Sequence, residues 1–264
     1  MSLFLKLITS VGIGSAKVDT KLKKNYFMQG EVLDGMVEIL GGNSNQKIDA
    51  IHLKLMTLYG HEGSSRLTNT VIHTNKLNDS FTIHAGERKE IPFSFRIPLD
   101  TPITMQDPET GKNIPPVWIA TEADVKNAID PRDKDYITIE PTKVHEQILD
   151  ALRVLGLKFR QMESQKLPFN LKSEKIFGQQ YEFVPTFGKY FKRLEEIEVY
   201  IFQGDIETTV LFDVDKLRKT PFSSVVDKLN LDKNKGSVTF KNEQILNDRR
   251  SVSDEFEKII DRVL

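Results

Sequence analysis

The sequence predicts an all-β protein of two tandem β-sandwich domains, with short helices at the N-terminus, between the domains and at the C-terminus. Short runs of alternating apolar side chains recur along the 264 residues and are separated by glycine and asparagine, which is typical of a β-sandwich. Residues 143–156 change to helical spacing, and a second series of strand-like runs follows them. The predicted domains are residues 1–142 and 143–264.

The first apolar run predicts a short N-terminal helix over residues 3–11, which Gly12 and Gly14 would end. Its apolar face consists of Leu3, Phe4, Leu7, Ile8 and Val11. A helix this short is marginal in water, so the face must be buried somewhere. Docking on the first sandwich, contact with a second copy or another protein, and contact with a membrane all remain open.

Strand patterns then run from Ala16 to Pro98. Residues 18–22 alternate beside a group of four lysines, Lys17, Lys21, Lys23 and Lys24. This group predicts a solvated strand face, with an anionic partner as the alternative. A long strand follows with its apolar side chains on one face, then a polar loop and further strands at residues 71–77 and 81–83. The one-sided residues of the long strand are Ile51, Leu53, Leu55, Thr57 and Tyr59.

Residues 86–98 give the clearest strand pattern in the chain. Four large apolar residues, Ile91, Phe93, Phe95 and Ile97, alternate with proline, serine and arginine. Side chains alternate faces in a strand, so these four line one side. Pro92 lacks an amide donor, which predicts an edge strand, a strand end or a bulge.

Beyond residue 100 the pattern predicts returning strands at 117–119 and 136–139, and a helix over 143–156 that stops at Gly156. A hairpin is predicted for residues 197–212 with Gly204 in its turn. Helical spacing returns at residues 222–229 and 252–263. The apolar face of the last helix includes Phe256, Ile259, Ile260 and Val263. This face has three alternative docking sites: the second sandwich, a partner protein or a second copy of the chain.

Several stretches in order resemble an arrestin-like family, the bacterial sporulation-control proteins of the SpoOM type. They are Gly12-Ile13-Gly14-Ser15-Ala16-Lys17-Val18-Asp19-Thr20, Gly30-Glu31-Val32-Leu33-Asp34-Gly35-Met36-Val37, Pro92-Phe93-Ser94-Phe95-Arg96-Ile97-Pro98, Val117-Trp118-Ile119 and Asp130-Pro131-Arg132-Asp133-Lys134-Asp135-Tyr136. The resemblance covers most of the chain and weakens after residue 220. It implies two arrestin-like sandwiches and a cytoplasmic, non-catalytic regulator of sporulation or of a related developmental or envelope process.

Composition and motifs favour a protein that is not an enzyme. The net charge of −1 provides no field for nucleic acid, and the absence of cysteine excludes disulfides and thiolate chemistry. The chain has no nucleophile elbow, phosphate loop or calcium loop, and no zinc-binding pair among His52, His61, His73, His84 and His145. Asp130, Asp133 and Asp135 look like a polar turn of mixed charge. We therefore predict no catalytic residue, cofactor or metal.

The predicted function is that of an arrestin-like scaffold that contacts proteins. The expected partners are one or more proteins of unknown identity, with a homo-oligomer as a further option, and no nucleic acid. The predicted interaction surface combines the two apolar helix faces, Leu3, Phe4, Leu7, Ile8 and Val11 with Phe256, Ile259, Ile260 and Val263. The predicted location is cytoplasmic, with the inner face of the membrane as an alternative. The rival functions are a peripheral membrane adaptor and a ligand-binding or hydrolytic β-sandwich.

Overall fold

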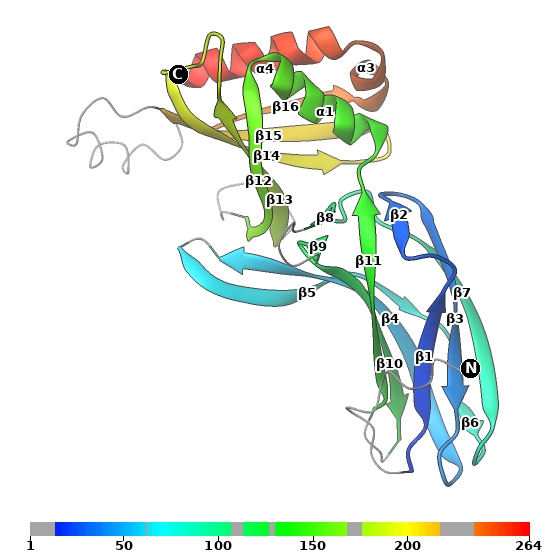
Figure 1. Ribbon diagram of the computed structural model, residues 1–264. Helices are drawn as coiled ribbons and strands as arrows, with labels where there is room; N and C mark the ends of the chain where they lie inside the picture. Colours follow the sequence, from blue (N-terminus) through cyan, green and yellow to red (C-terminus); the bar gives the residue numbers. More distant parts are fainter. Residues whose placement is uncertain (1–13, 62, 107–112, 127–129, 168–175, 217–234) are drawn as a thin grey trace. The chain divides into compact units, whose positions relative to one another are not determined.

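The structure is a computed structural model that describes residues 14–61, 63–106, 113–126, 130–167, 176–216 and 235–264. By its internal contacts the chain divides into two compact units (Figure 1). The first unit comprises Met1–Leu58 and Thr68–Glu140, and the second comprises Tyr59–Leu67 and Pro141–Leu264. The limits of the two domains as independent folding units stay a prediction. No helix in the described ranges is both long and apolar enough to cross a membrane.

One sheet of the first unit has three strands in the order β1-β3-β7. These are β1 (Lys17–Leu22), β3 (Val32–Leu40) and β7 (Arg88–Arg96). In β7 the side chains of Phe93 and Phe95 are buried, as their alternation predicted. Pro92 lies opposite Met36 on a strand at the sheet edge, which confirms the edge position that its missing amide donor favoured.

The second sheet of this unit is built around a central strand, β10, which is antiparallel to both of its neighbours. Its strands are β2 (Tyr26–Met28), β4 (Gln46–His61), β5 (Ser64–Lys76), β6 (Phe81–Ile83), β10 (Val117–Val125) and β11 (Arg132–Glu140), and a separate small hairpin joins β8 (Met105–Gln106) to β9 (Asn113–Ile114). Ile51, Leu53 and Leu55 are buried on one face of β4. The polar loop predicted after Tyr59 is wrong: β4 and β5 extend into that region as paired strands.

The second unit contains an antiparallel sheet whose strands follow each other in sequence order. They are β12 (Leu157–Lys166), β13 (Phe177–Pro185), β14 (Leu194–Gln203), β15 (Glu207–Lys216) and β16 (Lys235–Lys241). The predicted hairpin is the β14–β15 pair with Gly204 in its turn. Tyr59 and Gly60 belong to this unit because Tyr59 stacks on Phe177 at 5.7 Å and Gly60 pairs with Gln165 of β12.

Among the described residues, three helices accompany this sheet, α1 (Lys143–Val154), α3 (Asn242–Asn247) and α4 (Arg249–Val263). Helix α1 begins where the hydroxyl of Thr142 accepts a hydrogen bond from the backbone N–H of His145 at 3.1 Å. Past its end Gly156 has a φ of 81°, a conformation that glycine adopts without strain. The helix predicted for residues 143–156 is thus confirmed, whereas the one predicted for 222–229 lies outside the described residues.

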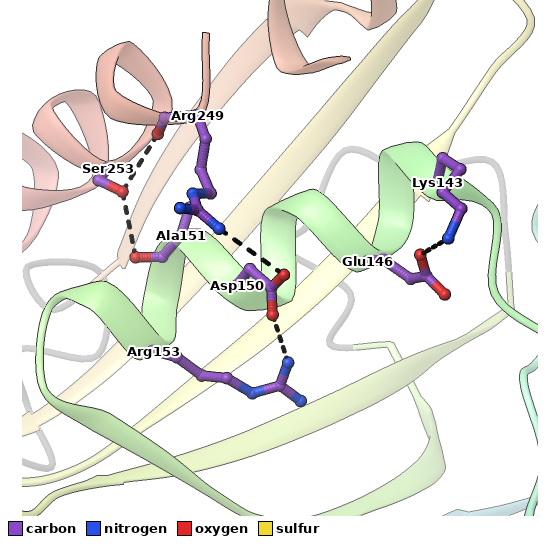
Figure 2. Close-up of polar contacts among 7 residues, drawn as sticks. All are labelled: Lys143, Glu146, Asp150, Ala151, Arg153, Arg249 and Ser253. Carbon is purple, nitrogen blue, oxygen red and sulfur yellow. Dashed lines mark hydrogen bonds and ion pairs between the residues drawn. The ribbon is translucent and has the colours of Figure 1, made fainter. Parts of the chain in front are cut away.

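Helices α1 and α4 contact each other and pack on the sheet (Figure 1). The buried Ser253 hydroxyl lies 3.3 Å from the carbonyl oxygen of Ala151 and 3.2 Å from that of Arg249 (Figure 2). Arg249 also approaches Asp150 of α1 at 4.0 Å (Figure 2). The polar face of each helix therefore helps to set the register in which their apolar faces meet the sheet.

Candidate binding groove

One of the two apolar helix faces expected to form an interaction surface is buried in the structure. Phe256, Ile259, Ile260 and Val263 are buried inside the second unit. The ring of Phe256 meets the rings of Phe212 and Phe240 at centroid distances of 5.0 and 5.8 Å. Helix α4 is thus docked on the protein's own sheet, because its apolar face fits the apolar face of β15 and β16. The other half of the expected surface, Leu3, Phe4, Leu7, Ile8 and Val11, lies outside the described residues.

A groove of about 780 Å³ runs along β1 in the first unit. Residues of β1, β3, β7 and β11 line it, together with Lys24 and Asn25 after the end of β1. Strand β1 lies at the edge of its sheet and contacts β10 and β11 of the other sheet. The groove thus forms where the two sheets of the sandwich approach each other along an open side.

A buried polar network joins the two sheets beside the groove. The backbone N–H of Thr20 donates to Oδ2 of Asp133 at 2.7 Å, and the hydroxyls of Thr20 and Thr121 are 2.6 Å apart. All three residues are buried. Each partner satisfies a group that would otherwise be costly to bury, so this network holds β1 against β11.

Asp135 lies two residues along β11 from Asp133, lines the groove, and keeps Oδ2 buried without a hydrogen-bond partner in the described structure. Burial, together with the nearby carboxylates of Asp133 and Asp19, raises the pKa of Asp135 to about 7, although Lys21 acts in the opposite direction. Two like charges this close disfavour simultaneous ionisation. Near neutral pH the pair therefore holds a proton for part of the time.

Cationic side chains outnumber acidic ones around the groove. The cationic residues are Lys17, Lys21, Lys24, Arg88, Lys89, Arg132 and Lys134, and the acidic ones are Asp19, Glu38, Glu90 and Asp135. Some of the positive charge is matched locally, since Lys24 contacts Glu31 at 2.5 Å. Lys134 instead lies over the rings of Trp118 and Tyr136, at 3.9 and 4.5 Å from their centroids. The excess of positive charge favours an anionic ligand.

The backbone of β1 also faces the groove. Residues of a strand direct their amides alternately to its two sides. The amides of Ala16 and Thr20 point away from β3: the first donates to Gln46 Oε1 at 2.7 Å and the second to Asp133. The amide of Val18, between them, therefore points the same way. Two of these amides are thus already bonded within the protein, and their bonds tie β1 to the other sheet.

Within the described lining, the groove has no histidine, serine or cysteine. Over the described ranges, no group of three or more acidic or histidine side chains is placed to hold a metal ion. The carboxyl pair can exchange a proton. The arrangement is suited to binding an anionic ligand.

Part of this site was visible in the sequence, but in two unrelated pieces. The lysine group was interpreted as a solvated face, and three of its members, Lys17, Lys21 and Lys24, line the groove. The group of aspartates was interpreted as a polar turn, and this was wrong: Asp133 and Asp135 lie within β11. Thr20, Thr121, Arg88 and Lys89 were missed, because nothing in their local pattern distinguishes them from ordinary strand residues.

Comparison with known proteins is consistent across sequence and structure. A family model described as SpoOM protein matches residues 4–218. The chain is 36% identical over 218 residues to the sporulation-control protein Spo0M of Bacillus subtilis (strain 168), with 82% of this chain and 81% of the relative covered. The crystal structure of Spo0M from Bacillus subtilis matches with a TM-score of 0.79 at 30% identity, covering 96% of this chain and 100% of that one.

Proposed function

Because the chain belongs to the SpoOM protein family, we propose that it regulates sporulation, or a related developmental or envelope process, by binding protein partners without catalysis. Its homology to a sporulation-control protein supports the regulatory role. In this proposal it is a cytoplasmic, arrestin-like scaffold, and the groove along β1 takes up a segment of the partner.

The excess of positive charge around the groove carries this proposal. A partner segment that carries negative charge would complement this lining. Carboxylate or phosphate groups on such a segment would meet the lysines and arginines of the groove, and charge-assisted hydrogen bonds are stronger than neutral ones. The expected partner segment is therefore acidic or phosphorylated.

The test reverses charge in the groove and leaves the core intact. Lys17 and Lys89 are exposed groove residues, so Lys17→Glu/Lys89→Glu should fold normally. Lys76→Glu, at an exposed position of the same unit outside the groove, is the matched control. Each protein is used to capture partners from cells in which the wild type is native, and captured partners are then bound again as purified proteins at low and high salt.

We expect at least one direct, salt-sensitive partner that the double variant loses and the control keeps. Cells whose own copy is replaced by the double variant should show the regulatory defect of a deletion. Equal capture by the double variant and the control would show that the groove is not the binding site. A wild type that binds no purified partner, yet complements the deletion, would overturn the scaffold function itself.

A further inference from the structure

The loop between β13 and β14, residues 186–193, presents two phenylalanines to solvent. Phe187 is 63% exposed and Phe191 is 48% exposed. We call residues 186–193 the aromatic loop. Single exposed apolar residues are common at protein surfaces, but two large aromatic rings four positions apart on one loop require an explanation.

The aromatic loop is held firmly, so this exposure does not come from a frayed segment. Tyr190, between the two phenylalanines, is buried, and its hydroxyl donates to the backbone carbonyl of Glu257 in α4 at 3.3 Å. Lys189 forms ion pairs with Glu257 at 2.9 Å and with Asp261 at 2.5 Å. Helix α4 is itself packed on the sheet, so the loop has a rigid base.

The backbone of the loop is held in an unfavourable conformation. Lys192 has a φ of 63°, a left-handed conformation that lysine seldom adopts. Such strain persists only where the surroundings enforce it, and it gathers at functional sites. Here the backbone N–H groups of Arg193 and Leu194 both bond to the carbonyl of Tyr190, at 3.0 and 3.1 Å. The turn thus fixes the backbone on which Phe191 is carried.

A neighbouring turn adds a third apolar side chain. Val154, at the end of α1, is 60% exposed. Its turn is joined to the loop, since the backbone N–H of Thr186 donates to the carbonyl of Gly156 at 3.0 Å. A side chain at Gly156 would lie only 2.4 Å from the carbonyl oxygen of Phe187. The backbone of the loop therefore lies directly against the turn that ends α1.

The charged residues of the loop itself are all basic, and the acidic side chains near it belong to α4 and β14. The loop contains Lys189, Lys192 and Arg193 and no acidic residue. Lys189 is matched by the carboxylates of α4, whereas Lys192 Nζ lies 5.5 Å from the centre of the Phe191 ring. Glu195, the nearest acid along the chain, is exposed in β14. Aromatic rings flanked by basic side chains are the usual composition of a surface that enters the interface of an anionic membrane.

Size distinguishes between a membrane and a protein partner. A stable protein interface buries roughly 1,200–2,000 Å² in total, which is more than two rings and one valine can supply. A lipid interface needs no complementary surface, and a few inserted apolar side chains with nearby cations give weak, reversible binding. We propose that the aromatic loop is a contact site for the surface of a membrane that contains anionic lipids. The loop lies in the second unit, so this contact does not depend on the groove.

The experiment measures co-sedimentation of the full chain with vesicles of phosphatidylcholine, with and without phosphatidylglycerol. The test variant is Phe187→Ser/Phe191→Ser. The matched control is Ile206→Ser, which removes a 74% exposed apolar side chain from the β14–β15 turn of the same unit. Lys192→Gln tests the contribution of charge. A deletion of residues 2–11 tests the N-terminal apolar segment separately.

We expect the wild type to bind the anionic vesicles, and binding to weaken at high salt. The double phenylalanine variant should bind at least about tenfold more weakly, since it removes two large apolar groups. Lys192→Gln should lower the partition constant about fivefold, whereas Ile206→Ser should match the wild type.

A wild type that stays in the supernatant at low salt and high lipid would overturn the proposal without any variant. Undiminished binding by the double variant, with loss of binding on deletion of residues 2–11, would assign the contact to the N-terminal segment and overturn it as well. Thermal unfolding of each variant checks that a loss of binding does not come from a loss of folding.

Discussion

His145 offers the sharpest test of how the second unit is packed. It lies in α1, where it is 2% exposed, and its ring meets that of Tyr181 edge-on at 5.2 Å. Neither ring nitrogen has a hydrogen-bond partner in the described structure. Burial alone lowers the pKa of His145 from 6.5 to about 4. The folded protein therefore keeps this imidazole neutral under conditions in which the unfolded chain would protonate it.

The sign of the effect on stability follows from proton binding. Between pH 6.5 and pH 4 the unfolded chain binds more protons at His145, so stability falls as the pH falls. The two pKa values imply a loss of about 1 kcal/mol at pH 6, about 2 at pH 5 and about 3 at pH 4. The variant His145→Leu keeps a similar volume and has no group to protonate, so it should not lose stability in this way.

The assay is urea unfolding of the wild type and His145→Leu at pH 7, 6 and 5, reported as the difference between the two proteins at each pH. The difference is needed because Asp135 and Glu198, whose pKa values are raised to about 7, change stability in the opposite direction. At pH 7 the two should agree within about 1.5 kcal/mol, the range of the lost ring contact. By pH 5 the variant should have gained about 2 kcal/mol on the wild type.

Substitution of the exposed His84 by glutamine, measured at the same pH values, is the control for removal of a histidine. A difference for His145→Leu that does not change with pH would refute the reasoning, because it would mean that the imidazole is solvated or has a partner in the folded protein.

Three further substitutions test other parts of the fold. Phe93→Ala should lower the free energy of unfolding by about 3–5 kcal/mol, because the ring is buried against Gly35. A loss below about 1 kcal/mol in urea unfolding would mean that the faces of β7 are misassigned. Gly236→Ala should lower the free energy of unfolding by about 1–3 kcal/mol, since the new methyl group would lie 2.4 Å from Ile259 Cγ2. Adding Ile259→Ala should restore part of this loss. Additive losses in the double variant would contradict the close approach of α4 to β16. Asp135→Asn should raise the melting temperature relative to the wild type more at pH 8 than at pH 5. The pKa of Asp135 is about 7 in the folded protein and 3.8 in the unfolded chain, so the wild type loses stability as the pH rises between these values. Equal shifts in melting temperature at both pH values would show that the carboxyl group is not buried beside Asp133.

Local side-chain patterns were enough to predict most of the regular structure. The alternation around Phe93, the long one-sided strand at 51–59, the helix after Thr142 and the hairpin at Gly204 were all confirmed. Each depends on neighbours within a few residues, whose side chains repeat every two positions in a strand or every three to four in a helix. The pattern was misleading between β4 and β5, where exposed polar side chains on a paired strand resemble a loop.

The candidate groove depended on contacts that no local pattern contains. Thr20 and Asp133 are 113 residues apart in the chain, and the lysines of β1 meet the aspartates of β11 only when the two sheets pack. In the same way, the face of Phe256 was identified as apolar from its spacing, but only the folded sheet shows that β15 and β16 cover it. The sequence by itself determined which faces are apolar and which residues are charged, because these are properties of single residues and their spacing. The tertiary structure alone decided which faces are buried against each other and which charges come together, because burial and charge proximity are set by distance in space.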